Sequence, residues 1–479
     1  MKKLALVIGF FLILATSISF AQENSPEEWY QMGREFLDQG QYEKALEYLN
    51  QALEISPDDV AALNDKGVAL YFLGRYREAV GVLQKALELD PEYTTAYYNL
   101  GTTYLEIGDY PQAEKYLQET LKREPNHGDA CYNLGLVYLD SGEYYKGAVY
   151  FQEAFRLSQN LNALNNLGNC YYYLRFLDLA EETYQKVLAK DPAYLYAHYN
   201  LGNVYTDKGE VQKAEESYRK AITLEPGYVE AHNALGNLYY TQEKYNQALE
   251  EYQKVVALDP SFISGWLNLG NTYYEMGYLY RSIDAYERLL ELNPNDHQVL
   301  TYIGINYVDL GRYHSAIEKL QEALRIQPDY APAFFNLGNA YFDMNDFPQA
   351  IAMYEKALAL DPSYAIAYNN LGNAYVFANN YLKAEENYQK ALAINSGYFL
   401  ARYNLANLYF KMEKYPEAVA EYEKAVELDP YNPEVHYELG LAYFKQGDIE
   451  KAEGQLGILA ELDPNLAQEL QKEMEKEVK

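Results

Sequence analysis

Residues 263–296 read ISGWLNLGNTYYEMGYLYRSIDAYERLLELNPND, and variants of this stretch recur along the 479-residue chain. The leucine of a Leu-Gly-Asn triplet marks the repeat, because successive copies lie 34 residues, or twice that number, apart. These leucines are Leu167, Leu201, Leu235, Leu269, Leu337 and Leu371. An internal period of this length indicates a repeat array, in which each unit packs only against its neighbours.

The apolar pattern within residues 263–296 predicts two helices joined by a turn. With Ile263 counted as position 1, positions 4, 7, 8 and 11 share one helical face at about 100° per residue. Gly277 follows where the end of a helix needs a left-handed residue. A second amphipathic stretch has Ser282, Tyr286 and Leu289 at positions 20, 24 and 27, and Pro294 ends it because proline cannot continue a helix.

The spacing W-x2-L-G-x2-Y, followed by a small residue, an aromatic, an apolar residue and Pro, resembles the tetratricopeptide repeat. The resemblance implies an all-α fold, a right-handed superhelical α-solenoid of helix-turn-helix repeats. It is specific because the pattern returns down the whole chain. The thirteen predicted units are 26–59, 60–93, 94–127, 128–160, 161–194, 195–228, 229–262, 263–296, 297–330, 331–364, 365–398, 399–432 and 433–464.

The two ends of the chain differ from the repeats. Lys2 and Lys3 precede an apolar run that ends in Ser19-Phe20-Ala21, which predicts a secretory signal peptide over residues 1–21. Residues 22–25 form a polar leader, and residues 465–479 predict an amphipathic capping helix. We therefore expect an exported protein, periplasmic or extracellular, with no stable membrane insertion once the signal is removed.

The composition and the motifs of the sequence limit the partners and activities that can be expected. The formal net charge of −31 argues against nucleic acid as a partner and indicates either a solvated surface or a preference for basic segments. Cys131 and Cys170 are expected to be packing thiols, although export would permit a disulfide between them. The sequence contains no metal-ligand spacing, phosphate-binding loop or nucleophile motif. We therefore predict a protein that is not an enzyme and has no catalytic residues, cofactor or metal.

The face opposite the core of the first helix is the candidate ligand groove, as the family resemblance implies for tetratricopeptide arrays. Positions 6 and 9 carry asparagine in most units, and an amide both donates and accepts hydrogen bonds without fixed charge. The candidate amides are Asn99, Asn133, Asn166, Asn169, Asn200, Asn203, Asn237, Asn268, Asn271, Asn336, Asn339, Asn370, Asn373, Asn404 and Asn407. The candidate aromatic flanks are Tyr98, Tyr132, Tyr199, Tyr240 and Tyr274.

Two functions fit this face. The first is an interaction scaffold that binds extended peptide segments of other proteins, basic ones favoured. The array resembles the repeat portion of the O-linked N-acetylglucosamine transferases, whose asparagine ladder holds peptides, but the sequence has no counterpart of their catalytic domain. The alternative is a glycan-binding accessory protein of the envelope or of exopolysaccharide export. Passive copying of asparagine during duplication of the unit is the remaining explanation of the ladder.

Overall fold

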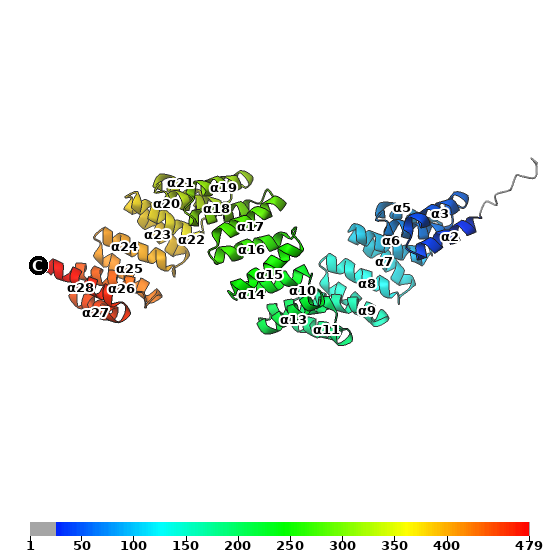
Figure 1. Ribbon diagram of the computed structural model, residues 1–479, viewed down its shortest axis with the longest axis horizontal. Coiled ribbons are helices and arrows are strands. Elements are labelled where there is room, and N and C mark those ends of the chain that lie inside the picture. Colours follow the sequence, from blue (N-terminus) through cyan, green and yellow to red (C-terminus); the bar gives the residue numbers. More distant parts are fainter. Residues whose placement is uncertain (1–24, 479) are drawn as a thin grey trace, which may run out of the picture. The chain divides into compact units, whose positions relative to one another are not determined.

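Each repeat forms a pair of helices in the computed structural model, which describes residues 25–478 (Figure 1). The described residues form α-helices and no strand, so the predicted all-α helical repeat array is confirmed. The predicted signal peptide and residues 22–24 of the leader lie outside the described residues.

The first helices of the pairs begin close to the predicted repeat starts. They are α2 (Pro26–Asp38), α4 (Val60–Phe72), α6 (Thr94–Ile107), α8 (Gly128–Asp140), α10 (Leu161–Tyr173), α12 (Leu195–Asp207), α14 (Val229–Tyr240), α16 (Ile263–Glu275), α18 (His297–Asp309), α20 (Ala331–Asp343), α22 (Ala365–Phe377), α24 (Phe399–Lys411) and α26 (Pro433–Gln446).

The second helices follow after short turns, and one further helix closes the array. The second helices are α3 (Tyr42–Ile55), α5 (Tyr76–Leu89), α7 (Tyr110–Arg123), α9 (Tyr144–Ser158), α11 (Leu177–Lys190), α13 (Val211–Leu224), α15 (Tyr245–Leu258), α17 (Leu279–Leu292), α19 (Tyr313–Ile326), α21 (Phe347–Leu360), α23 (Tyr381–Ile394), α25 (Tyr415–Leu428) and α27 (Ile449–Leu462). The last helix, α28 (Pro464–Val478), packs on α26 and α27.

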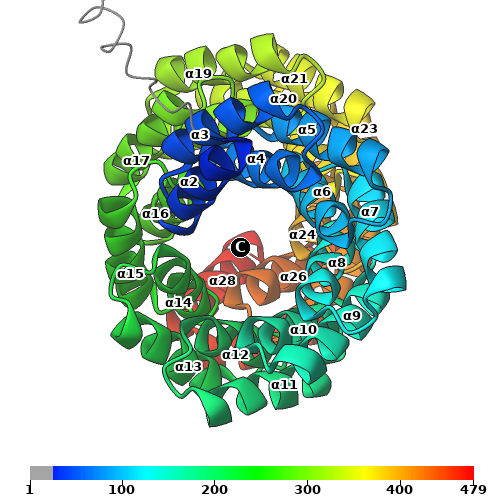
Figure 2. The same cartoon turned by 90° about the vertical axis from the view of Figure 1, so that its right-hand side faces the viewer.

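The chain divides into two compact units, one that ends at Ala234 and one that begins at Leu235. Within each unit, the second helix of a pair packs on the first helix of the next pair, and consecutive first helices also touch. The first helices therefore form the inner row of each unit and the second helices the outer row (Figure 2). Positions 6 and 9 of the repeat lie along this inner row.

Position 8 is glycine in every repeat except 399–432, which has Ala406, because the side chain at position 24 of the same pair lies directly on it. A methyl group at Gly338 would lie 2.5 Å from the ring of Tyr354, and one at Gly101 would lie 2.7 Å from Leu117. The two helices of a pair approach each other through this contact. At the end of the array the capping helix supplies the same contact, since Leu470 lies against Gly440.

The turn inside each pair requires one residue with positive φ. Gly277 takes it with a φ of 74°, and glycine takes it in most pairs. In the other pairs the residue with positive φ is Arg175, Glu243, Asn345, Asn379 or Glu413. For a residue with a Cβ this conformation costs roughly 1–2 kcal/mol.

We predict that Glu413→Gly stabilises the array by about 1 kcal/mol, because glycine adopts the φ of 59° at this exposed turn without strain. The reverse change, Gly277→Ala, should destabilise by a similar amount, since no atom lies within 4 Å of the added methyl and only backbone strain is introduced. Urea unfolding followed by circular dichroism measures both. Equal midpoints for the two variants would contradict the assignment of strain.

Cys131 and Cys170 are both buried and both free, as expected of packing thiols. Burial raises the pKa of Cys131 to about 11, with a smaller contribution from Glu153, and burial raises the pKa of Cys170 to about 12. The thiolate is therefore scarce at neutral pH.

We predict that iodoacetamide at pH 8 labels neither thiol in the folded protein and labels both in urea, because alkylation requires an accessible thiolate. Mass spectrometry gives the number of labels. Rapid labelling under native conditions, or a mass two hydrogens lower before reduction, would show that the thiols are exposed or paired.

Candidate functional site

The asparagine at position 9 accepts a hydrogen bond from the buried tyrosine at position 24 of the same helix pair. The tyrosine ring lies over position 8 of the first helix, which is Ala406 in the pair of Tyr422 and glycine in the other pairs, and its hydroxyl reaches the inner row. The donor–acceptor pairs, hydroxyl to Oδ1, are Tyr184–Asn169 (2.7 Å), Tyr218–Asn203 (2.8 Å), Tyr252–Asn237 (2.7 Å), Tyr286–Asn271 (2.6 Å), Tyr354–Asn339 (2.8 Å), Tyr388–Asn373 (2.6 Å) and Tyr422–Asn407 (2.5 Å).

Repeats without the tyrosine also lack the asparagine. Where position 24 holds a residue with no hydroxyl, position 9 holds something other than asparagine. The pairs are Leu49 with Arg34, Leu83 with Val68, Leu117 with Thr102, Phe151 with Leu136, Leu320 with Ile305, and Leu456 with Leu441. A buried hydroxyl without a partner costs about 1–3 kcal/mol, so the two positions change together. The sequence analysis missed this signal because it treated position 24 as packing and position 9 as groove.

The asparagine at position 6 joins one repeat to the preceding one. Asn200 donates to Asn169 Oδ1 at 3.0 Å, Asn268 to Asn237 at 3.0 Å and Asn370 to Asn339 at 3.1 Å. In these repeats one Oδ1 therefore accepts from a tyrosine of its own pair and from an amide of the next pair. We call this chain of amides the asparagine ladder.

Asparagines at position 5, where the sequence pattern predicts aromatic side chains, also belong to the ladder. Asn99 donates to Asn64 at 2.8 Å, Asn200 to Asn165 at 3.2 Å and Asn404 to Asn369 at 3.0 Å. Asn64, Asn165 and Asn369 are buried. The other predicted amides at position 6 donate within or between neighbouring helices: Asn133 to Thr102 (2.9 Å), Asn166 to the Tyr132 hydroxyl (3.3 Å) and Asn336 to the Pro332 carbonyl (2.8 Å).

The bonds above occupy the carbonyl side of the position 9 amides and leave the NH2 groups of three of them without a partner among the described residues. Asn169 and Asn339 donate to Asn166 and Asn336 in their own helices. The Nδ2 groups of Asn237, Asn271 and Asn373 make no hydrogen bond to any described residue, and none of these groups is among the buried unpaired atoms. The side chains of Asn203 and Asn407 donate toward the hydroxyls of Tyr199 and Tyr403, which partly offsets the rise that burial causes in the pKa of each tyrosine. Three amides therefore present free donors.

The predicted aromatic flanks have mixed roles. Tyr98 stacks on His127 with ring centroids 4.7 Å apart, and Tyr199 meets Tyr228 edge to face. The Tyr274 hydroxyl donates to Asp309 Oδ2 at 2.9 Å, while Tyr240 contacts Tyr245 edge to face and lines a cavity described below. Tyr98, Tyr132 and Tyr199 are thus held by neighbouring side chains.

Carboxylates accompany the ladder at position 13. Burial raises the pKa of Asp140, and burial together with the charge of Asp309 raises the pKa of Asp343. Glu438, at position 6 of the last repeat, also has a pKa raised by burial and by Glu434. Among residues 25–478 no cluster of His, Cys, Asp or Glu could hold a metal ion. The face therefore combines neutral amides with negative charge.

Comparison with known proteins identifies the repeat family. Family models described as tetratricopeptide repeat match residues 30–94, 73–134, 128–161, 183–216, 263–296, 365–398 and 433–466. A further model, described as TPR repeat, matches residues 202–242, 236–277, 304–345, 338–376 and 406–447. Together these matches cover most of the described chain.

A curated relative and two solved structures are similar over different lengths. The photosystem I assembly protein Ycf3 of Acaryochloris marina is 47% identical over 45 residues, which span 9% of this chain and 27% of that protein. A chain of the APC/C hetero-tetramer Cut9–Hcn1 is 17% identical to this protein. The match covers 89% of this chain and 98% of that chain, with a TM-score of 0.45. Yeast Tom70 is 17% identical over 86% of this chain and 93% of its own, with a TM-score of 0.40.

The tyrosine–asparagine bond can be tested by a double-mutant cycle at Tyr388 and Asn373. We predict that Tyr388→Phe and Asn373→Ile each destabilise the array by about 1–3 kcal/mol, because each leaves one polar partner unsatisfied. The double variant should lose less than the sum, with a coupling near 1 kcal/mol. The double variant approaches the apolar pair that Ile305 and Leu320 form at the same positions. Tyr431→Phe, at a hydroxyl-bearing residue 80% exposed, is the control and should be neutral.

Urea unfolding of the three variants and the control measures the cycle. Additive losses from Tyr388→Phe and Asn373→Ile would mean that the hydroxyl and the amide do not stabilise each other.

Proposed function

Because the chain belongs to the tetratricopeptide repeat family, whose helical arrays serve as protein–protein interaction scaffolds, we propose that it is an exported, non-catalytic scaffold. In this proposal the inner row of first helices holds extended peptide segments of partner proteins. The observation that carries the proposal is the set of free Nδ2 donors at Asn237, Asn271 and Asn373.

The free amide groups complement a peptide backbone. The position 9 amides offer NH2 donors, and Asn200 and Asn404 at position 6 donate through Nδ2 and keep Oδ1 as an acceptor. A peptide group carries one acceptor and one donor, so such a face can bind main chain whatever the side chains are. Packed helices lie about 8–10 Å apart and an extended chain rises about 3.3 Å per residue, so about three residues would pass each repeat.

Charge would then select among peptides. The formal net charge of the chain is −31, and carboxylates at position 13 stand beside the ladder. A negative groove raises the local concentration of positively charged ligands. Segments with lysine or arginine are therefore the favoured partners.

Export rests on the first residues of the sequence. Lys2 and Lys3, the apolar run after them and Ser19-Phe20-Ala21 match the three regions of a secretory signal. Among residues 25–478, no helix combines the length and the apolar character needed to cross a bilayer. The periplasm or the extracellular space is the proposed location.

A glycan is the alternative ligand. Sugar hydroxyls also donate and accept hydrogen bonds, and the apolar face of a sugar ring stacks on aromatic side chains. The position of Tyr240 beside Asn271 favours this alternative, since both line one cavity.

The test compares a peptide array and a glycan array probed with the purified protein and with a variant that removes four Nδ2 donors at position 9, including the free ones of Asn271 and Asn373. The variant carries Asn203→Asp, Asn271→Asp, Asn373→Asp and Asn407→Asp. Aspartate keeps an oxygen acceptor for Tyr218, Tyr286, Tyr388 and Tyr422, so the fold should persist, while the NH2 donor is lost. We predict peptide binding by the parent and at least a tenfold loss in the variant.

A control variant separates the donors from the added charge. Asn126→Asp, Asn246→Asp, Asn295→Asp and Asn465→Asp add the same four negative charges at exposed asparagines away from the ladder. This control should bind peptides as the parent does. Glycan binding that falls in the ladder variant, with no peptide binding, would favour the alternative. Equal peptide binding by parent and ladder variant would remove the ladder from the ligand site.

A further inference from the structure

The asparagine ladder is interrupted in the repeat of residues 297–330. Position 6 is Tyr302, position 9 is Ile305 and position 24 is Leu320, where the neighbouring repeats have asparagine, asparagine and tyrosine. Asn271 in the preceding repeat therefore accepts a hydrogen bond from Tyr286 alone, because the next repeat has Tyr302 instead of an asparagine at position 6. The same repeat carries Asn306 at position 10, where Ala340, Ala374 and Leu408 stand in later repeats.

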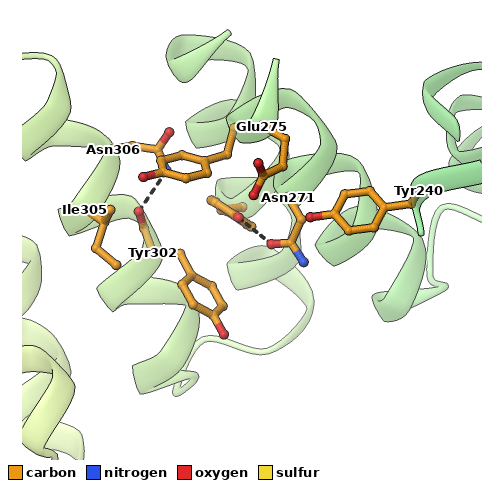
Figure 3. Close-up of a pocket in the computed structure, with 8 residues that line it drawn as sticks. Tyr240, Asn271, Glu275, Tyr302, Ile305 and Asn306 are labelled. Atoms are coloured by element: carbon orange, nitrogen blue, oxygen red, sulfur yellow. Dashed lines mark hydrogen bonds between the residues drawn. The ribbon is translucent and has the colours of Figure 1, made fainter. Parts of the chain in front are cut away.

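A cavity of about 270 Å³ lies at this interruption, within the unit that begins at Leu235. Figure 3 shows Glu275, Asn271, Tyr302 and Asn306 around it, with Tyr240 and Ile305 on opposite sides. Tyr274 and Tyr286 complete the lining. Its walls are therefore mainly aromatic, and its amide and carboxylate groups come from α16 and α18.

Asn306 places an unpaired acceptor in the wall of the cavity. Its side chain is 1% exposed, Nδ2 donates to the Tyr302 carbonyl at 2.8 Å, and Oδ1 has no hydrogen-bond donor. The carbonyl of Tyr302 fixes this orientation, because the flipped amide would bring two oxygens together. An alanine at this position would have no such acceptor, so stability alone does not account for asparagine here.

Among the remaining polar groups of the cavity, Glu275 accepts, whereas Asn271 Nδ2 and the hydroxyls of Tyr240 and Tyr302 can donate. Glu275 is exposed and forms no ion pair with any described residue. The hydroxyls of Tyr274 and Tyr286 are already committed to Asp309 and Asn271. Burial raises the pKa of Tyr274 to about 12, and the hydrogen bond to Asp309 and the charges of Asp309 and Glu275 add to it. The site thus offers aromatic faces, a carboxylate and an amide oxygen.

We propose that this cavity binds the guanidinium group of an arginine side chain carried by the bound peptide. Guanidinium is planar, stacks on aromatic rings and presents several N–H donors to oxygen acceptors. Glu275 supplies the countercharge and Asn306 Oδ1 accepts an N–H once the tyrosine walls adjust around the ligand. The inference rests on the proposed function, since the cavity opens where the ladder would guide the main chain. An arginine bound in the cavity would fix the register of the peptide in a groove that otherwise binds main chain of any sequence.

The test uses two labelled peptides, acetyl-(Gly-Ser)3-Arg-(Ser-Gly)3-amide and the same peptide with citrulline in place of arginine. Citrulline has nearly the shape of arginine without its charge. Fluorescence anisotropy with the purified protein should show the arginine peptide binding about tenfold more tightly. Glu275→Gln and Asn306→Ala should each reduce this ratio to about two or less and leave the affinity for the citrulline peptide unchanged.

Two controls make the outcome decisive. Asp140→Asn removes a negative charge at the same repeat position as Glu275 but in the other unit, and should keep the tenfold ratio. Asn306→Ala introduces the alanine that the next two repeats have at position 10. The melting temperature of this variant should therefore equal or exceed that of the parent protein.

Equal binding of the two peptides by the parent would overturn the arginine site and leave the peptide groove standing. An arginine preference that survives in both Glu275→Gln and Asn306→Ala would also overturn the arginine site, because the preference would then come from net charge. No binding of either peptide would reject the groove together with its arginine site.

Discussion

The hydrogen bond from a buried tyrosine hydroxyl to an asparagine carbonyl is the interaction that connects the core of this protein with its inner face. Glycine at position 8 lets the ring at position 24 lie flat on the first helix, with no Cβ between them. The ring fills the core, and its hydroxyl emerges beside position 9. Because burial raises the pKa of these tyrosines, Tyr184 and Tyr388 among them, the hydroxyl keeps its proton and needs an acceptor.

Once the tyrosine has fixed the carbonyl, the orientation of the whole amide is determined. Its NH2 group faces away from the core, and its oxygen keeps a second lone pair for the amide of the next repeat, as Asn339 shows by accepting from both Tyr354 and Asn370. The same side chains therefore stabilise a helix pair and connect adjacent pairs, and in the proposed function they also present donors to a ligand. Where the residue types change, at Tyr302 and Ile305, the regular face gives way to a cavity.

Much of the fold follows from the period of the sequence. The spacing of Trp266, Leu269, Gly270 and Tyr273 and the turn at Gly277 predict a helix pair, and α16 and α17 have these limits. Sequence patterns identify which positions share a face, but they do not show which polar atoms of two helices meet. The bond between Tyr286 and Asn271 joins residues 15 apart, on different helices, and it is visible in sequence only as the joint occurrence of the two residue types. The role of Asn64 and Asn165 was missed for the same reason.

Side-chain hydrogen exchange, followed by NMR in protein labelled with 15N at asparagine, measures directly which side of each amide is bound. The account predicts that Nδ2 protons of Asn237, Asn271 and Asn373 exchange rapidly in the free protein and slow when a peptide binds. One Nδ2 proton each of Asn200 and Asn370, which donate to Asn169 and Asn339, should be protected throughout. Equal exchange in the two sets would contradict the claim that tyrosine orients the ladder and leaves its donors free.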